Sequence, residues 1–198
     1  MRVGPIVGLS LLIVGATGTG AVAAETGKRA RPNAVPAAER PSLLSEFRFG
    51  FSAQDPWGPE TGSGNVTGEL LLAKPFTAAD LFTSYFIPRP HIGGSLNFGD
   101  RTSFAYAGLT WSVDITPRVF VEGSFGGAVH NGSTSPYFTP PNRQALGCSP
   151  LFRESGSIGV KLAGNWSLLA TVEHLSNGGS CAENRGLTNI GARLGYSF

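Results

Sequence analysis

Eight stretches of this chain alternate apolar and polar residues with a period of two, and this pattern most restricts the folds open to it. Such alternation is typical of β-strands that have one apolar and one polar face. The stretches cover residues 46–53, 66–72, 91–98, 105–114, 119–129, 152–162, 166–173 and 189–198. Beyond residue 24, no run of apolar residues reaches the roughly 18 that a membrane helix needs. If the mature chain enters a membrane, it must therefore do so as a closed barrel.

The polar faces of these stretches favour a barrel with a polar interior over a soluble sandwich with an apolar one. They carry five acids and four bases, a nearly neutral set that can form ion pairs inside a narrow lumen. The nine residues are Glu46, Arg48, Glu69, Asp114, Glu122, Arg153, Lys161, Glu173 and Arg193. Charged residues make up only 14% of the chain, against roughly 25% in soluble domains. The pattern has imperfections, since Phe120 lies on a polar side, and Glu154 and several glycines lie on apolar sides.

The connections and the C-terminus also fit an outer-membrane barrel, in which short periplasmic turns alternate with longer outer loops. Residues 116–117 and 164–165 form short connections, whereas 130–151 and 177–186 form longer ones. The chain ends at Phe198, and a terminal aromatic residue there resembles the signature that the barrel assembly machinery reads. The expected fold class is therefore all-β, an eight-stranded antiparallel transmembrane β-barrel of the outer-membrane type.

One connection does not fit this scheme. Residues 74–90 are long for a periplasmic turn, and they include Leu81-Phe82 and Tyr85-Phe86. We expect this segment either to extend the third strand or to lie at the membrane interface.

Three regions are expected along the chain. Residues 1–24 read as a secretory signal peptide, with a positive start, an apolar run over 7–16 and small residues before the cleavage site. A membrane anchor is the alternative, but the run is too short to cross roughly 30 Å of hydrocarbon. Residues 25–43 are polar and proline-rich and read as a flexible periplasmic lead-in. Residues 44–198 form the expected barrel domain.

His174 and Ser176 are the candidate site. The seventh stretch reads WSLLATVEHLSN, so a period of two puts both side chains on the face of Trp166 and Val172, which we assign to lipid. With both chain ends in the periplasm, this end of the stretch lies at the cell surface. Ionisable residues at membrane depth usually mark function, and a histidine can turn a nearby serine into a nucleophile. The alternative is an interfacial pair at headgroup level, and the pattern by itself favours neither.

Several short motifs add to this pair. HLSN at 174–177 is followed by NRG at 184–186 and GYSF at 195–198, with PRPHIGG at 88–94 and YAGLTW at 106–111 upstream. Together they resemble the lipid A 3-O-deacylases, the PagL-like outer-membrane esterases. The resemblance is sharpest over residues 166–198 and looser over 44–163.

The resemblance implies a Ser-His-Glu triad on the outer surface of an eight-stranded barrel. We expect neither a cofactor nor a metal, and no Cys/His spacing in the chain indicates a zinc site. It implies hydrolysis of the ester at position 3 of lipid A, with release of a 3-hydroxy fatty acid. By this resemblance Ser176 is the nucleophile and His174 the general base, while Asn177 holds the oxyanion or orients the site. The implied partners are lipid A (lipopolysaccharide), outer-membrane lipid and the barrel assembly machinery, and a homodimer stays open. The net charge of +2 is too small to indicate binding of nucleic acid.

This sequence lacks the acid of the triad, because Thr188 stands at the position that matches the family's glutamate. Glu173 is expected to face the lumen, and Glu183 is an alternative acid if its loop folds back. Otherwise Thr188 or Asn189 orients the imidazole, or the pair works as a dyad. Losing a triad's acid can cost about 10⁴ in rate, so a structural or adhesive barrel without catalysis is the alternative function. A small pore is the third hypothesis, and it is disfavoured because side chains fill the interior of an eight-stranded barrel.

The remaining polar residues of note are two cysteines and two histidines. Cys148 and Cys181 lie in the two long loops, and outside the cytoplasm such cysteines are oxidised. We therefore predict a disulfide beside the candidate site, the alternative being two isolated thiols. His91 on the lumen face and His130 at a loop edge are expected to be hydrogen-bonded structural residues.

Overall fold

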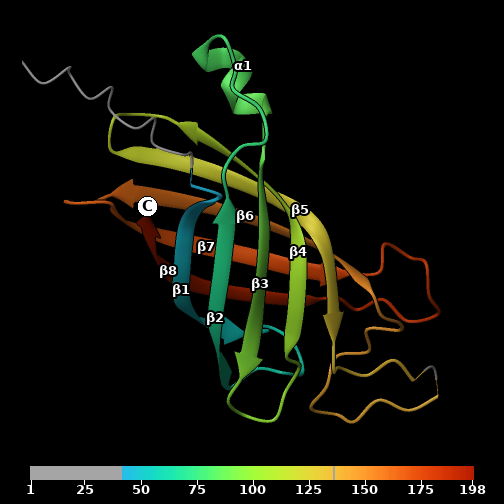
Figure 1. Cartoon of the computed structure of the whole chain (residues 1–198). Coiled ribbons are helices and arrows are strands. Elements are labelled where there is room, and N and C mark those ends of the chain that lie inside the picture. Colours follow the sequence, from blue (N-terminus) through green and yellow to red (C-terminus); the bar gives the residue numbers. More distant parts are fainter. Residues whose placement is uncertain (1–41, 136) are drawn as a thin grey trace, which may run out of the picture. The chain divides into compact units, whose positions relative to one another are not determined.

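The computed structural model describes residues 42–135 and 137–198 and confirms an antiparallel barrel of eight strands (Figure 1). Each strand pairs with its neighbours along the chain, and β1 closes the barrel by pairing with β8. The strands are β1 (Leu44–Gln54), β2 (Ser63–Leu72), β3 (Arg89–Asn97), β4 (Phe104–Asp114), β5 (Val119–His130), β6 (Leu151–Lys161), β7 (Trp166–Ser176) and β8 (Leu187–Ser197). The predicted signal peptide and nearly all of the predicted lead-in lie in residues 1–41, outside the described residues.

The two faces of the strands are distributed as the alternation predicts. Apolar side chains such as Phe51 and Val172 are exposed on the outer surface, at 58% and 47%. Charged side chains are buried in the lumen, among them Arg48 at 2% exposure and Arg153 at 1%. An exposed apolar band around a polar interior is the arrangement of barrels that span the outer membrane.

Ion pairs cross the lumen. The Arg48 guanidinium contacts the carboxylates of Glu46 and Glu122 with N–O distances of 2.8 and 2.6 Å. It also reaches Glu69 at 3.4 Å. Arg89, which the alternation did not assign to the lumen, contacts both Glu46 and Glu122 at 2.8 Å. This fourth arginine supplies a second cationic partner to each of the two carboxylates.

A second group of charges sits deeper toward the loops. Glu173 accepts from Arg153 at 2.7 Å and from Arg193 at 3.1 Å, and the Arg153 guanidinium lies 3.7 Å from the centroid of the Tyr106 ring. Because these side chains are nearly fully buried, they fill the interior, which argues against the small-pore reading. The expectation that Glu173 faces the lumen is confirmed.

Phe120 breaks the polar lumen pattern because a neighbouring strand leaves room for its ring. Phe120 is 6% exposed and pairs with Gly159 of β6. A Cβ added at Gly159 would come within 2.3 Å of the ring. The glycine therefore allows an aromatic residue on a face that is otherwise polar.

The long connection between β2 and β3 contains a short helix, α1 (Leu81–Phe86), which the alternation did not reveal. Asp80 caps its N-terminus by accepting from Thr83 N–H. The indole N–H of Trp111 donates to the carbonyl of Phe86, which fixes the end of α1 beside β4. Strand β3 starts at Arg89, so the segment extends that strand only slightly. None of the helices in the described ranges is long and apolar enough to cross a membrane.

The loops at the opposite end are tied to one another. The predicted disulfide between Cys148 and Cys181 is confirmed and links the loop after β5 to the loop after β7. The buried Glu60 carboxylate accepts from the side chain of Gln54, from both the backbone and the hydroxyl of Thr102, and from Gln144 N–H. These contacts close the lumen at this end, which we call the loop end.

Candidate active site

The predicted pair lies on the outer face of β7, close to the loop end. His174 and Ser176 are both half-buried, while Leu175 between them is fully buried on the lumen side. Across the sheet, His174 pairs with Thr188 of β8, and Ser176 pairs with Phe152 of β6. The orientation predicted from the period of two is therefore what the structure has.

The imidazole of His174 is held by Thr188. Their Nδ1 and Oγ1 atoms lie 2.8 Å apart, so one ring nitrogen is occupied by the residue that the sequence comparison above expects at the position of the triad's acid. The other nitrogen, Nε2, lies against Gly186, where an added Cβ would come within 2.9 Å of it. Gly186 also has a φ of +68°, which favours glycine. A side chain at position 186 would displace the ring.

The hydroxyl of Ser176 is free of hydrogen bonds to the described residues, including His174. Catalytic hydrogen bonds are often long or absent before substrate binds. The two side chains project from the same strand face at alternate positions, so Nε2 is the ring nitrogen available to Ser176. This arrangement can deprotonate a serine hydroxyl toward a substrate on the outer surface.

Asn177 is buried and organises the loops. Its side-chain N–H groups donate to the carbonyls of Leu146 and Glu183, and its side-chain oxygen accepts from Gly179 N–H. Its own backbone N–H donates to Asn184. The short HLSN motif did not reveal these contacts, because Leu146 belongs to a loop distant in sequence.

The other candidates for orienting the imidazole lie elsewhere. Asn189 is buried toward the lumen, where its side-chain oxygen accepts from Asp55 N–H. Glu183 lines a cavity of about 330 Å³ between loops, together with Tyr137 and Arg143. Among the described contacts, none joins the Glu183 carboxylate to His174.

The two remaining histidines are hydrogen-bonded within the barrel, as expected of structural residues. His91 bonds to Thr110 in the lumen through Nδ1. His130 bonds to the carbonyl of Cys148 through Nε2 and accepts from Gly132 N–H. In residues 42–135 and 137–198, no group of three His, Cys, Asp or Glu residues is placed to bind a metal ion.

Comparison with known proteins decides the family. The sequence profile described as Lipid A 3-O-deacylase (PagL) matches residues 71–197, which include the site and six whole strands. The chain belongs to the lipid A 3-O-deacylase family. The members of this family are ester hydrolases, so the chain belongs to an enzyme family.

Solved structures agree on the fold. A crystal structure of the outer membrane enzyme PagL superposes on this chain with a TM-score of 0.63 and a sequence identity of 16%. The alignment covers 78% of this chain and 100% of the PagL chain. A de novo designed transmembrane β-barrel is 11% identical, covers 80% of this chain and 98% of its own, and has a TM-score of 0.51. No curated protein matches the sequence. The barrel is thus of the outer-membrane type.

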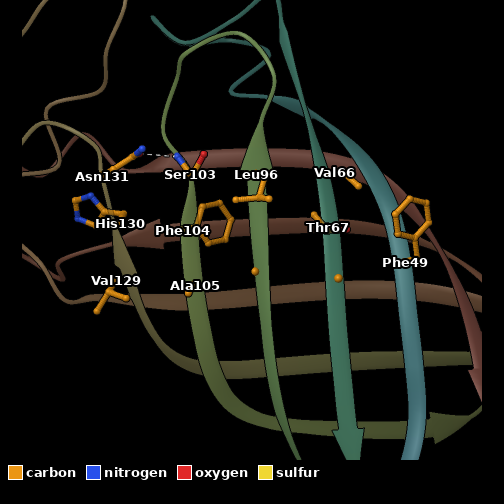
Figure 2. A pocket seen from close by; sticks show the side chains of 12 residues that line it. Phe49, Val66, Thr67, Leu96, Ser103, Phe104, Ala105, Val129, His130 and Asn131 are labelled. Carbon is orange, nitrogen blue, oxygen red and sulfur yellow. Dashed lines mark hydrogen bonds between the residues drawn. The ribbon is translucent and has the colours of Figure 1, made fainter.

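Two depressions mark the outer surface of this deacylase-family barrel. One, of about 330 Å³, lies beside the site and is lined by Phe125, Phe152, Cys148 and Asn177 among others. The other, of about 660 Å³, lies over β1 to β5 (Figure 2). Its floor contains small residues in register, Gly68, Gly94 and Ala105, and neither His174 nor Ser176 lines it.

Proposed function

We propose that the chain hydrolyses the ester-linked acyl chain at position 3 of lipid A, with Ser176 as nucleophile and His174 as general base. The observation that carries the proposal is where this pair lies. Both side chains are on the outer face of β7 at the loop end. A lipid substrate in the same leaflet can reach that face without leaving the membrane. Family membership supplies the reaction class.

The geometry supports a covalent mechanism in two stages. His174 Nε2 accepts the Ser176 hydroxyl proton while Oγ bonds to the ester carbonyl carbon. The tetrahedral intermediate then breaks its bond to the sugar oxygen, which receives the proton from His174. Water, deprotonated in turn by His174, attacks the acyl-serine and releases the 3-hydroxy fatty acid, and the serine hydroxyl is restored. Splitting the reaction in this way replaces one difficult step by two easier ones.

The surroundings of the pair suit a membrane substrate. Outer-membrane barrels have short periplasmic turns and longer outer loops, so the loop end faces the outside of the cell. Phe152, Val172 and Ile190 flank the site on the outer face. These apolar side chains would contact the acyl chains, while Ser176 and His174 lie at the level of the esters that join those chains to the sugar.

Asn177 acts here as an orienting residue. Its side-chain N–H groups are already donated to Leu146 and Glu183, and its backbone N–H to Asn184. It therefore fixes the loop that carries Gly186 against the imidazole, and is less suited to donate to the oxyanion.

Thr188 orients the imidazole without supplying a charge. Replacing it by valine keeps the shape and removes the bond to Nδ1, which for a neutral hydrogen bond is worth about 1 kcal/mol. We expect Thr188→Val to lower kcat about fivefold, measured as release of 3-hydroxy fatty acid from lipid A. Thr77→Val is the control, because it makes the same change at an exposed position in the connection between β2 and β3, at the opposite end of the barrel. An unchanged kcat in Thr188→Val would show that this bond does not orient the ring.

The absence of a glutamate at position 188 favours one other function, a structural or adhesive barrel that has lost catalysis. The two functions differ in what happens to lipid A. We would express the full chain in a bacterial host whose own lipid A keeps its 3-O-linked acyl chain, and compare lipid A by mass spectrometry with vector-only cells. The proposed activity gives a species lacking one 3-hydroxyacyl chain at position 3. A folded barrel with unchanged lipid A supports the structural alternative, and loss from another position contradicts the assignment of the ester.

A further inference from the structure

Only two side chains that carry or can take up a charge near neutral pH occupy outward-facing positions on the eight described strands, Glu154 of β6 and His174 of β7. All other outward positions carry apolar, small or hydroxyl residues, and the remaining charged strand residues lie on the lumen side. A charge on the lipid face destabilises a barrel, by an amount that depends on depth. Ionisable residues in such places usually mark function.

These two residues are direct partners across the sheet. Glu154 pairs with His174 in the register of β6 and β7, and His174 pairs with Thr188 on its other side. Side chains directly opposite one another in an antiparallel pair have Cβ atoms about 4.5–5.5 Å apart. His174 therefore stands between Glu154 of β6 and Thr188 of β8, and its ring is hydrogen-bonded to Thr188.

Among the direct cross-strand partners of His174, Glu154 is the one that carries a charge. The lumen-facing charges on the positions next to this pair, Arg153 of β6 and Glu173 of β7, form an ion pair with each other at 2.7 Å. Phe125 of β5 is the partner of Glu154 on its far side, and its ring stacks on Phe152 with centroids 5.9 Å apart. Glu154 is exposed on this outer face, so in a membrane its carboxylate would be next to these rings and lipid, where charge interactions are stronger than in water.

We propose that Glu154 is a positioning residue that supplies the negative charge missing at position 188. This inference rests on the proposed function, because it concerns the same imidazole. Thr188 holds Nδ1 and fixes the orientation of the ring. Glu154 acts across the strand pair and stabilises the positive charge that forms when His174 takes the proton of Ser176. In a triad, one carboxylate both orients the imidazole and stabilises its positive charge. Here Thr188 of β8 would orient the ring and Glu154 of β6 would stabilise the charge.

The first test compares single variants of the full barrel acting on purified lipid A. We expect Glu154→Gln to lower kcat about 100-fold with little change in KM. This is less than the roughly 10⁴-fold loss for a whole triad acid, because Thr188 still holds the ring. Glu154→Asp should recover part of the loss. Asp100→Asn, an exposed acid at the loop end, is the matched control. If Glu183→Gln shows the large loss and Glu154→Gln does not, Glu183 supplies the charge and the inference is wrong.

The second test separates a charge effect from a folding effect by moving the carboxylate to position 188. In a Thr188→Glu background the imidazole has a charged partner on β8, so adding Glu154→Gln should lower kcat by less than about fivefold. Equal losses in both backgrounds would show that Glu154 only supports the fold, which overturns the inference. An active wild type whose kcat is matched by Glu154→Gln overturns it while leaving the proposed function intact. An inactive wild type contradicts the proposed function, and the inference falls with it.

Discussion

Replacing Ser176 by alanine should give a folded barrel that no longer removes the acyl chain. The hydroxyl oxygen forms the bond to the substrate carbonyl, and loss of a triad nucleophile lowers kcat by on the order of 10⁶. The Ser176 hydroxyl is unbonded to the described residues. Its loss should therefore change the free energy of unfolding by less than about 0.5 kcal/mol.

The measurement is the amount of 3-hydroxy fatty acid released from lipid A, with folding checked by the heat-dependent mobility of the barrel in gels. Ser197→Ala is the matched control, because Ser197 ends β8 at the opposite end of the barrel and the change is the same. The control should keep full activity. Normal deacylation by Ser176→Ala would refute the assignment of the nucleophile, whatever the fate of the fold.

Replacing Arg48 by methionine should destabilise the barrel strongly. The Arg48 side chain is 3% exposed and joins Glu46 and Glu122 in the lumen. Removing one partner of a buried ion pair typically costs about 3–5 kcal/mol, because the other charge stays buried and less well paired. Arg89 still contacts both carboxylates, so we expect the lower part of that range.

The matched control is Lys161→Met, which removes a lysine paired with Asp114 at 2.7 Å where both side chains are 46% exposed. An ion pair of that exposure contributes about 0–1 kcal/mol. Urea unfolding of the barrels in lipid vesicles gives the two free energies. If Arg48→Met fails to fold, Arg48→Lys still tests the point, since it keeps one charge but loses the two-pronged contact. Equal stabilities for the Arg48 and Lys161 variants would show that the lumen network does not stabilise the fold.

The chain shows which parts of a barrel can be derived from local pattern. The period of two correctly predicts the inward side of Glu69 and Glu173 and the outward side of His174 and Ser176, because side-chain direction in a strand depends only on position along that strand. The disulfide followed from the two loops that hold Cys148 and Cys181. Helix α1 was missed, since six residues capped by an aspartate leave no periodic signal.

The sequence by itself therefore determined the fold class, the two faces of every strand and the family. Only the tertiary structure decided which residues of different strands and loops are in contact. The pairing of Glu154 with His174, the contact of Thr188 with Nδ1 and the burial of Asn177 against Leu146 depend on strand register and on long-range loop contacts. Register is a relation between strands, fixed jointly by turn geometry and by the closing of β1 on β8. A pattern read along one strand contains no information about that relation.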